Sequence, residues 1–338
     1  MKMYNVAIVG ATGAVGQQLL TCLAERNFPI GELRLLASAR SKGKVISYCG
    51  TDYVVDETTE DSFAGIDIAL FAGGAASKMY AAAAVNAGAV VIDNSSSFRY
   101  DPEVPLVVPE VNPEDVRWHK GIIANPNCST IQMVVALKPL HDAAKIKRIV
   151  VSTYQAASGA GVEGLNELRD QAQILAADPN AEITPSAFVH QLAFNVIPHI
   201  DVFQDNDYTK EEMKMHWETQ KMFHDNEIRV SATAVRVPVY RSHSEAVSIE
   251  TERKLTAAEA KEILKNAPGV VLQDDIANKV YPMPLLSSDT DLVYVGRVRE
   301  DISCDNGLCL WVVADQIRKG AATNAVQIAE LLVKEELV

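Results

Sequence analysis

Short apolar runs alternate with helical stretches in the first third of the chain. Runs with almost no polar residue are typical of strands that are buried on both faces of a sheet. Their alternation with helices predicts a parallel sheet that is covered by helices. The predicted strands are residues 6–9, 33–37, 66–71, 89–92 and 106–108, and the predicted helices between them are residues 17–25 and 78–87.

The second part of the chain has a different pattern. Its strands are longer and alternate more clearly between apolar and polar positions, which predicts an α+β domain with a largely antiparallel or mixed sheet. One face of such a sheet is free to pack on helices or on another subunit. The predicted strands are residues 149–154, 227–235, 246–250, 292–299 and 308–313. The predicted helices are residues 162–176, 210–223, 257–266 and, after Gly320, residues 321–334.

Length and composition narrow the class of protein. A chain of 338 residues is too long for one ordinary core, so we expect two domains with a boundary near the Asn125-Pro126-Asn127 turn. The net charge of -13 argues against nucleic acid or an anionic membrane as a partner, although a local pocket can still bind an anion. The chain has no apolar run long enough for a transmembrane helix and no signal-peptide pattern. We therefore expect a cytoplasmic protein.

A glycine-rich loop follows the first predicted strand directly and opens the first predicted helix. Small residues let the backbone approach a pyrophosphate, and the helix N-terminus offers unpaired N–H groups. The spacing is G-x-x-G-x-x-G, and the alternative to nucleotide binding is a tight strand–helix turn. The candidate cofactor residues of this loop are Gly10, Thr12, Gly13, Ala14, Val15 and Gly16.

The end of the second predicted strand indicates which dinucleotide is bound. An NAD site usually has an acidic residue there for the ribose hydroxyls. Here residues 37–42 contain no acid, and Ser38, Arg40 and Ser41 suit the 2′-phosphate of NADP. The alternative is a solvated basic loop.

One of the five cysteines stands in a reactive context. Cys128 follows Asn127 and precedes an apolar helical run, residues 131–140, so it lies at a predicted helix start. The helix dipole and the free N–H groups there stabilise a thiolate, which can attack a carbonyl. The alternative is a small buried core residue. The cysteines are odd in number and scattered, which suggests neither a disulfide framework nor a metal site; the others are Cys22, Cys49, Cys304 and Cys309.

These motifs together resemble the aspartate-semialdehyde dehydrogenase family across essentially the whole chain. The resemblance implies reversible, NADPH-dependent reductive dephosphorylation of L-aspartyl 4-phosphate to L-aspartate 4-semialdehyde through a cysteine thioester. This reaction belongs to the biosynthesis of lysine and diaminopimelate, methionine, threonine and isoleucine. The matching segments are residues 10–16, 93–99, 125–130, 154–161, 211–214, 236–245 and 311–322.

The resemblance also implies a role for individual residues. Cys128 is the nucleophile, Gln155 lies beside it, and His243 is the general acid/base. Arg236 grips the substrate α-carboxylate. The remaining substrate-binding positions are Asn127, Glu211 for the amino group, and Arg99 and Lys214 for the phosphate. Further cofactor positions are Ser158, Gly159 and Gln316.

Each of these roles has a structural alternative. His243 is one of seven histidines, Arg99 could be a surface charge, and Lys214 with Glu211 could be a solvated pair on a helix. Two positions depart from the family pattern. Gln316 stands where the family more often has asparagine, and Ser242 stands where it often has glycine.

Other functions remain to be weighed. An N-acetylglutamyl-phosphate reductase or a triose-phosphate enzyme shares the chemistry, but its substrate does not call for the pairing of Arg236 with Glu211. A non-catalytic nucleotide-sensing protein does not need Cys128, Gln155, Arg236 and His243 together. A dehydrogenase without covalent catalysis does not need a cysteine at a helix start.

The resemblance completes the expected architecture. Residues 1–127 with 319–338 form a Rossmann-like, NADP-binding parallel-sheet domain, and residues 128–318 form an α+β catalytic and dimerisation domain. The expected assembly is a homodimer or homotetramer.

Overall fold

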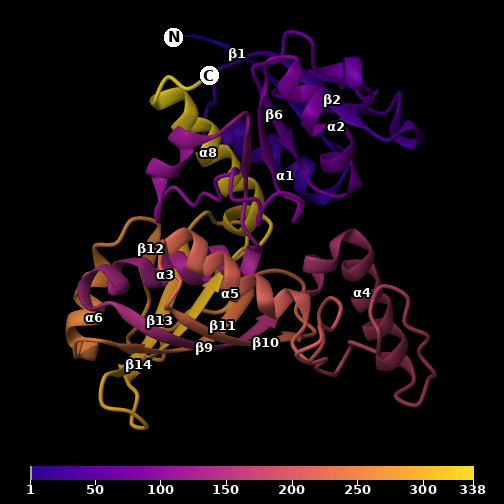
Figure 1. Cartoon of the computed structure of the whole chain (residues 1–338). Helices are drawn as coiled ribbons and strands as arrows, with labels where there is room; N and C mark the ends of the chain where they lie inside the picture. Colours follow the sequence, from indigo (N-terminus) through magenta and orange to yellow (C-terminus); the bar gives the residue numbers. More distant parts are fainter. Residues whose placement is uncertain (1) are drawn as a thin grey trace. The chain divides into compact units, whose positions relative to one another are not determined.

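The computed structural model describes residues 2–338 and separates into two compact units. The first contains the chain up to Asn127 together with Ala321–Val338, and the second is Cys128–Gly320 (Figure 1). Within the described residues, no helix is both long and apolar enough to cross a bilayer.

The first unit is built on a parallel sheet of six strands. Apolar runs form its central strands, as the sequence pattern predicted, and every strand pair is parallel. The spatial order is β5 (Asp56–Glu57), β2 (Ile30–Ala37), β1 (Tyr4–Val9), β6 (Ile68–Phe71), β7 (Val90–Asp93) and β8 (Ile122–Ala124). A separate hairpin joins β3 (Val45–Tyr48) to β4 (Thr51–Val54).

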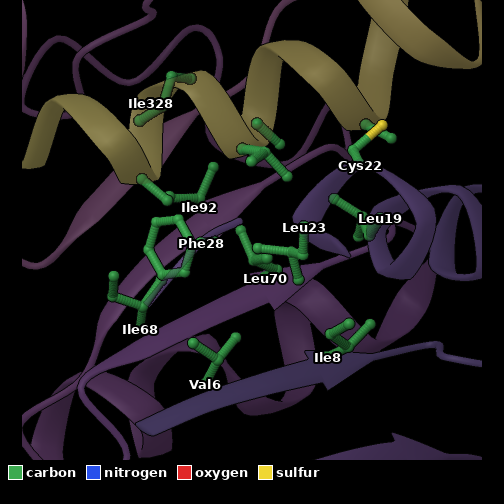
Figure 2. Packing of buried hydrophobic residues seen from close by; sticks show 14 of the residues in the cluster. Val6, Ile8, Leu19, Cys22, Leu23, Phe28, Ile68, Leu70, Ile92 and Ile328 are labelled. Atoms are coloured by element: carbon green, nitrogen blue, oxygen red, sulfur yellow. The ribbon is translucent and has the colours of Figure 1, made fainter. Parts of the chain in front are cut away.

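Helices cover this sheet on both faces. On one face, Leu19 and Leu23 of α1 (Ala14–Glu25) and Ile328 of α8 (Thr323–Lys334) belong to the same buried cluster as the strand residues Ile8 and Leu70 (Figure 2). On the other face, α2 (Ala75–Asn86) packs its alanines on a second apolar cluster. Burial of each large aliphatic side chain contributes about 1.5–3 kcal/mol, so the two layers hold the sheet and its loops firmly.

One predicted strand of the first unit is wrong. Residues 106–108 were expected to form a strand, but only an isolated bridge joins Leu106 to Ala124, and the edge strand is β8 instead. Pro105 and Pro109 flank the segment and have no N–H to donate to a ladder, so three apolar residues between them are buried without extending the sheet.

The second unit has a mixed sheet of six strands, which confirms the α+β prediction. Its outer pairs are parallel, and its inner pairs are antiparallel. The order is β10 (Arg229–Arg236), β9 (Ile146–Gln155), β11 (His243–Thr251), β14 (Gly307–Ala314), β13 (Val293–Glu300) and β12 (Val270–Leu272).

Three helices lie on one face of this sheet: α3 (Cys128–Ala144), α5 (Lys210–Phe223) and α6 (Ala257–Lys265) (Figure 1). The opposite face is only partly covered. There Tyr154 and Trp311 pack their rings 5.4 Å apart, and Tyr154 remains 38% exposed. The helix α4 (Gly161–Ala177) extends from the end of β9 through the short helix η4 (Ala157–Ala160), and α7 (Pro284–Ser287) precedes β13.

Candidate active site

The proposed nucleophile opens a helix, as the sequence predicted. Cys128 is the first residue of α3 and is partly exposed, whereas Ser129 and Thr130 behind it are buried. The helix dipole at this position favours the thiolate. A Cβ added at Gly320 would lie 3.0 Å from the Cβ of Cys128, so the glycine leaves room for the nucleophile. All five cysteines are free thiols.

Three other candidate residues meet at one end of the second sheet. Gln155 ends β9, Arg236 ends the parallel neighbour β10, and these two residues are direct partners in the register. His243 begins β11, which runs antiparallel to β9, so its first residues lie beside the last residues of β9. All three side chains are buried. Residues almost 90 positions apart in sequence are therefore brought together by strand register alone.

Hydrogen bonds fix the side chain of Gln155. Its Nε2 donates to Ser129 Oγ at 2.7 Å and to Glu211 Oε1 at 3.0 Å. Its Oε1 is buried without a hydrogen-bond partner among the described residues. Gln155 thus links the helix of Cys128 to α5 and keeps one acceptor for a bound molecule.

Glu211 and Lys214 form a buried cluster rather than a solvated pair. The ammonium of Lys214 lies 2.9 Å from Glu211 and 2.8 Å from Asp201, with side-chain exposures of only 11% for Lys214 and 8% for Glu211. Burial alone would lower the pKa of Lys214, but the two carboxylates raise it above its ordinary value. The cation is therefore permanent and already shared between two anions.

Arg236 is a buried cation with a fixed orientation. One of its terminal nitrogens donates to the carbonyl oxygen of Ala156 at 2.6 Å, and the guanidinium lies 5.8 Å from the ring centroid of Phe188. Burial lowers the pKa of Arg236, while Glu211 and the thiolate of Cys128 raise it. A guanidinium remains charged under such conditions. The positive charge of Arg236 therefore lies within electrostatic reach of the nucleophile.

His243 is completely buried and is held at one ring nitrogen. Its Nδ1 accepts a hydrogen bond from the backbone N–H of Ala156 at 3.0 Å, and its Nε2 is buried without a hydrogen-bond partner in the described part of the chain. Burial and the nearby Arg236 lower the pKa of His243 to about 3, so the ring is neutral at physiological pH. A Cβ at Gly159 would come within 2.7 Å of a terminal nitrogen of Arg236 and 3.4 Å of His243 Nε2, so a side chain at this position would displace the guanidinium of Arg236.

The glycine loop of the first unit forms a tight cradle. Gly10 has φ +88°, and a Cβ at Gly16 would approach the Gly10 carbonyl oxygen to 2.2 Å. Thr12 Oγ1 donates to Ser41 Oγ at 3.3 Å, which joins this loop to the predicted 2′-phosphate segment. Arg40 of that segment is exposed. No acidic side chain lies in the first turn of α1, so the loop, the helix N-terminus and Arg40 fit an anionic dinucleotide.

The other predicted residues lie in two different units. In the first, Arg99 Nε donates to the Asn125 carbonyl oxygen at 2.9 Å, and Arg99 and Asn127 are both buried. In the second, Gln316 donates to Ser158 Oγ, next to Gly159.

Three further residues contribute to the site, and the sequence pattern does not single them out. Ser129 accepts the hydrogen bond of Gln155, Asp201 pairs with Lys214, and Gly320 makes room for Cys128. Ser129 follows the cysteine directly and could have been inferred from that position. Asp201 lies in an irregular loop and Gly320 is 192 positions after the cysteine, with no local pattern that relates them to the site.

Family models match both units of the chain, and related proteins match it over nearly its whole length. A family model described as the NAD-binding domain of semialdehyde dehydrogenase matches residues 5–119, and one described as the semialdehyde dehydrogenase dimerisation domain matches residues 137–319. The chain is 59% identical to the aspartate-semialdehyde dehydrogenase of Aquifex aeolicus, over 99% of each chain. It is 51% identical to that of Bacillus subtilis, again over 99% of each chain.

Solved structures give the same match. The aspartate semialdehyde dehydrogenase II of Vibrio cholerae, complexed with ASA, aligns with a TM-score of 0.95 and 52% identity over 99% of both chains. The aspartate semialdehyde dehydrogenase of Candida albicans, solved with NADP, aligns with a TM-score of 0.78 and 25% identity over the whole of both chains.

Proposed function

The chain belongs to the aspartate-semialdehyde dehydrogenase family, and from this we propose that it converts L-aspartyl 4-phosphate into L-aspartate 4-semialdehyde and phosphate, reversibly. The observation that carries the proposal is the convergence of Gln155, Arg236 and His243 at one sheet end, with the charge of Arg236 in reach of Cys128. The physiological setting is the biosynthesis of lysine and diaminopimelate, methionine, threonine and isoleucine.

The head group of the proposed substrate is an amino acid. Its α-carboxylate requires a cation in the site, and its ammonium requires an anion. We assign the α-carboxylate to Arg236, because a planar guanidinium binds a carboxylate through two parallel hydrogen bonds. We assign the ammonium to Glu211, whose carboxylate is already held by Gln155 and Lys214. This pairing favours an aspartyl compound over an acylglutamyl phosphate, whose amino group is blocked.

The phosphate requires fixed positive charge. We assign it to Arg99 and Lys214, as the resemblance implies. Asp201 and Glu211 already hold the Lys214 ammonium, so a phosphate must share that cation, and two of the contacts that orient Arg99 are its hydrogen bonds to the carbonyl oxygens of Asn125 and Asn94.

The remaining residues have proposed roles in covalent catalysis and in cofactor binding. The Cys128 thiolate attacks the acyl carbon and forms a thioester, and Gln155 orients the acyl group through its amide. Asn127 contacts the substrate, and His243 is the general acid/base at the carbonyl oxygen. NADPH, when bound, supplies the hydride that reduces the thioester. We propose that residues 10–16, Ser38, Arg40 and Ser41 hold the adenosine and phosphate parts of this cofactor, and that Ser158, Gly159 and Gln316 hold its nicotinamide part.

The second unit carries the family's dimerisation domain, so the protein forms an oligomer. We propose a homodimer, or a homotetramer made of two such dimers, with the partly covered sheet face around Tyr154 and Trp311 as the interface. Sedimentation at micromolar concentration tests this, and a single species at the 36.7 kDa of one chain would refute it. We also propose that the enzyme works in the cytoplasm.

An assay of the oxidative direction tests the function. The protein is given aspartate semialdehyde, NADP and phosphate, and the absorbance of the reduced cofactor is followed. We expect turnover that requires phosphate and that is lost with N-acetylglutamate semialdehyde. Turnover that ignores phosphate, or that prefers the acetylated substrate, would contradict the proposal.

A further inference from the structure

The helix-covered face of the second sheet holds a buried polar cluster close to the proposed nucleophile. Its members are Glu245 of β11, Thr153 of β9 and Gln132 of α3, and none of them is exposed to solvent. We propose that Glu245 is a positioning residue: it holds the start of α3 on the sheet through Gln132 and so fixes the direction of Cys128. The inference rests on the proposed function and deepens it.

Strand register places Glu245 and Thr153 side by side. They are direct partners in the antiparallel pair of β11 and β9, so their Cβ atoms lie about 4.5–5.5 Å apart. His243 lies two residues before Glu245, and Gln155 lies two residues after Thr153. Side chains two residues apart point to the same face of a strand. The cluster therefore lies on the same face of the sheet as the site residues.

Gln132 connects the helix of the nucleophile to this cluster. It lies four residues after Cys128, one turn or about 5.4 Å further along the same side of α3. Its amide nitrogen donates to the carbonyl oxygen of His243 at 3.4 Å, and the same amide interacts with the carboxyl group of Glu245. The step from His243 to Glu245 along β11 is of similar length, about 6.7 Å. Because both elements begin at the site, the cluster lies one layer behind it.

The chemistry of the cluster requires a neutral Glu245. Burial raises the pKa of Glu245 well above its ordinary value, and the Gln132 amide offsets this only in part. A neutral carboxyl group has an O–H to donate. Gln132 Oε1 and Thr153 Oγ1 are both buried without a hydrogen-bond partner among the described residues, so either can accept it. Removal of the Glu245 carboxyl group would leave both of them buried without a polar neighbour to bond, which is costly.

A small movement of α3 would change the reactivity of the nucleophile. Gln155 already ties the helix to β9 through Ser129, directly behind Cys128. The contact of Gln132 with Glu245 ties the helix to β11 one turn further on. One tie fixes the distance between helix and sheet, and the second fixes the rotation of the helix. Covalent attack needs aligned atoms, and a misplacement of about 1 Å can cost on the order of 100-fold in rate.

The first test measures the reactivity of Cys128 in the full-length protein without substrate. The rate of its alkylation by iodoacetamide at neutral pH is read from the mass of the peptide that contains it. Glu245→Leu removes the carboxyl group at similar volume, and we expect it to slow alkylation on the order of 10-fold. Glu245→Gln keeps a donor and an acceptor and should restore the rate to within about 3-fold of the wild type. An unchanged rate in Glu245→Leu would overturn the proposal.

Steady-state kinetics separate positioning from substrate binding and from proton transfer. With aspartate semialdehyde, NADP and phosphate, Glu245→Leu should lower kcat on the order of 10-fold and keep KM for the semialdehyde within about 2-fold. Glu245→Gln should recover most of the lost turnover. If Glu245→Gln is as inactive as Glu245→Leu, the residue transfers a proton and the positioning role is wrong. A rise in KM with an unchanged kcat would contradict it as well.

Thr251→Val is the matched control for a general loss of stability. Thr251 is buried on the same face at the far end of β11, and its hydroxyl lies 2.8 Å from the carbonyl oxygen of Arg253 and 3.0 Å from that of Asn306. Loss of these contacts should lower the stability of the fold and leave alkylation and kcat as in the wild type. An equal fall of both rates in Thr251→Val would overturn the proposal.

Gln132→Met tests the other half of the tie. It should slow alkylation and turnover as Glu245→Leu does, and it decides the question if Glu245→Leu does not fold. Wild-type rates in Gln132→Met would contradict the proposal. If the wild type has no phosphate-dependent turnover, the proposed function fails, whereas the positioning of Cys128 is judged from the alkylation rates alone.

Discussion

The side-chain carbonyl of Gln316 accepts a hydrogen bond from the backbone N–H of Ser242 at 2.8 Å. The Gln316 amide also donates to Ser158 Oγ, and Ser242 Oγ lies 2.9 Å from Ser288 Oγ. Ser242 has φ +72°, a left-handed conformation that favours glycine. The two departures from the family pattern are therefore linked in space, and the glycine that the family often has at the second position is explained by the backbone.

The variant Gln316→Asn tests this link. Asparagine is one methylene shorter, so it cannot reach both Ser158 and Ser242, and the loss of one buried hydrogen bond should lower the free energy of unfolding by about 1–2 kcal/mol. Denaturant unfolding measures this. Ser242→Gly is the control, since it keeps the N–H and should stay within about 1 kcal/mol of the wild type. No loss in Gln316→Asn would show that the link is unimportant.

The sequence predicts features that depend on residues close together in the chain better than features that depend on residues far apart. The glycine loop and the cysteine at a helix start follow from local rules, because helix termini and tight turns are set by neighbours in the chain. The meeting of Gln155, Arg236 and His243 follows from the register of three strands, which no local pattern encodes. Only the family resemblance pointed to those residues. The burial of Lys214 depends on Asp201 in an irregular loop, so the sequence alone also allowed a solvated pair.

Two arginines should act on opposite ends of the substrate. Arg236→Ala should raise the Michaelis constant for aspartate semialdehyde and leave that for phosphate unchanged, and Arg99→Ala should do the reverse. Each loss should be about 2–4 kcal/mol, because the partner group is left buried without its mate. Arg236→Lys should not restore binding, since an ammonium cannot form the paired contact.

Steady-state kinetics with the two substrates varied separately measure both effects. Arg169→Ala, an exposed arginine on α4, serves as the control and should behave as the wild type. If Arg236→Ala and Arg99→Ala shift the same constant, the assignment of the two ends is wrong.

Arg40 should select NADP over NAD. Its guanidinium follows the second strand where an NAD enzyme has an acid, and Thr12 and Ser41 place this segment beside the glycine loop. Arg40→Ala should weaken NADP binding by about 1–2 kcal/mol, a modest value because the side chain is exposed, and should leave NAD binding unchanged. Titration of both dinucleotides measures the preference, and an unaltered ratio would remove Arg40 from the cofactor site.

The buried Glu245 should make stability depend on pH. Its carboxyl group is completely buried, and burial, which outweighs the neighbouring Gln132 amide, holds its pKa well above 4.5 in the folded chain. Above pH 4.5 the unfolded chain loses this proton and the folded chain keeps it, so the wild type loses stability as the pH rises toward the folded pKa. Glu245→Gln does not titrate.

The stability of Glu245→Gln relative to the wild type should therefore increase with pH above 4.5, by at most about 1.4 kcal/mol per pH unit. Denaturant unfolding at a series of pH values measures this slope. Glu60→Gln, at an exposed position, is the control and should show a flat difference. A flat difference for Glu245→Gln would mean that Glu245 is ionised in the folded protein.

The covalent intermediate on Cys128 is the central claim of this account. Aspartate semialdehyde and NADP are mixed with the enzyme without phosphate, the reaction is quenched in acid, and the protein is digested and weighed by mass spectrometry. We predict an aspartyl adduct on the peptide that contains Cys128, removed by added phosphate and absent in Cys128→Ser, which still binds NADP. Turnover by Cys128→Ser near the wild-type rate, or an adduct on another cysteine, would contradict the account.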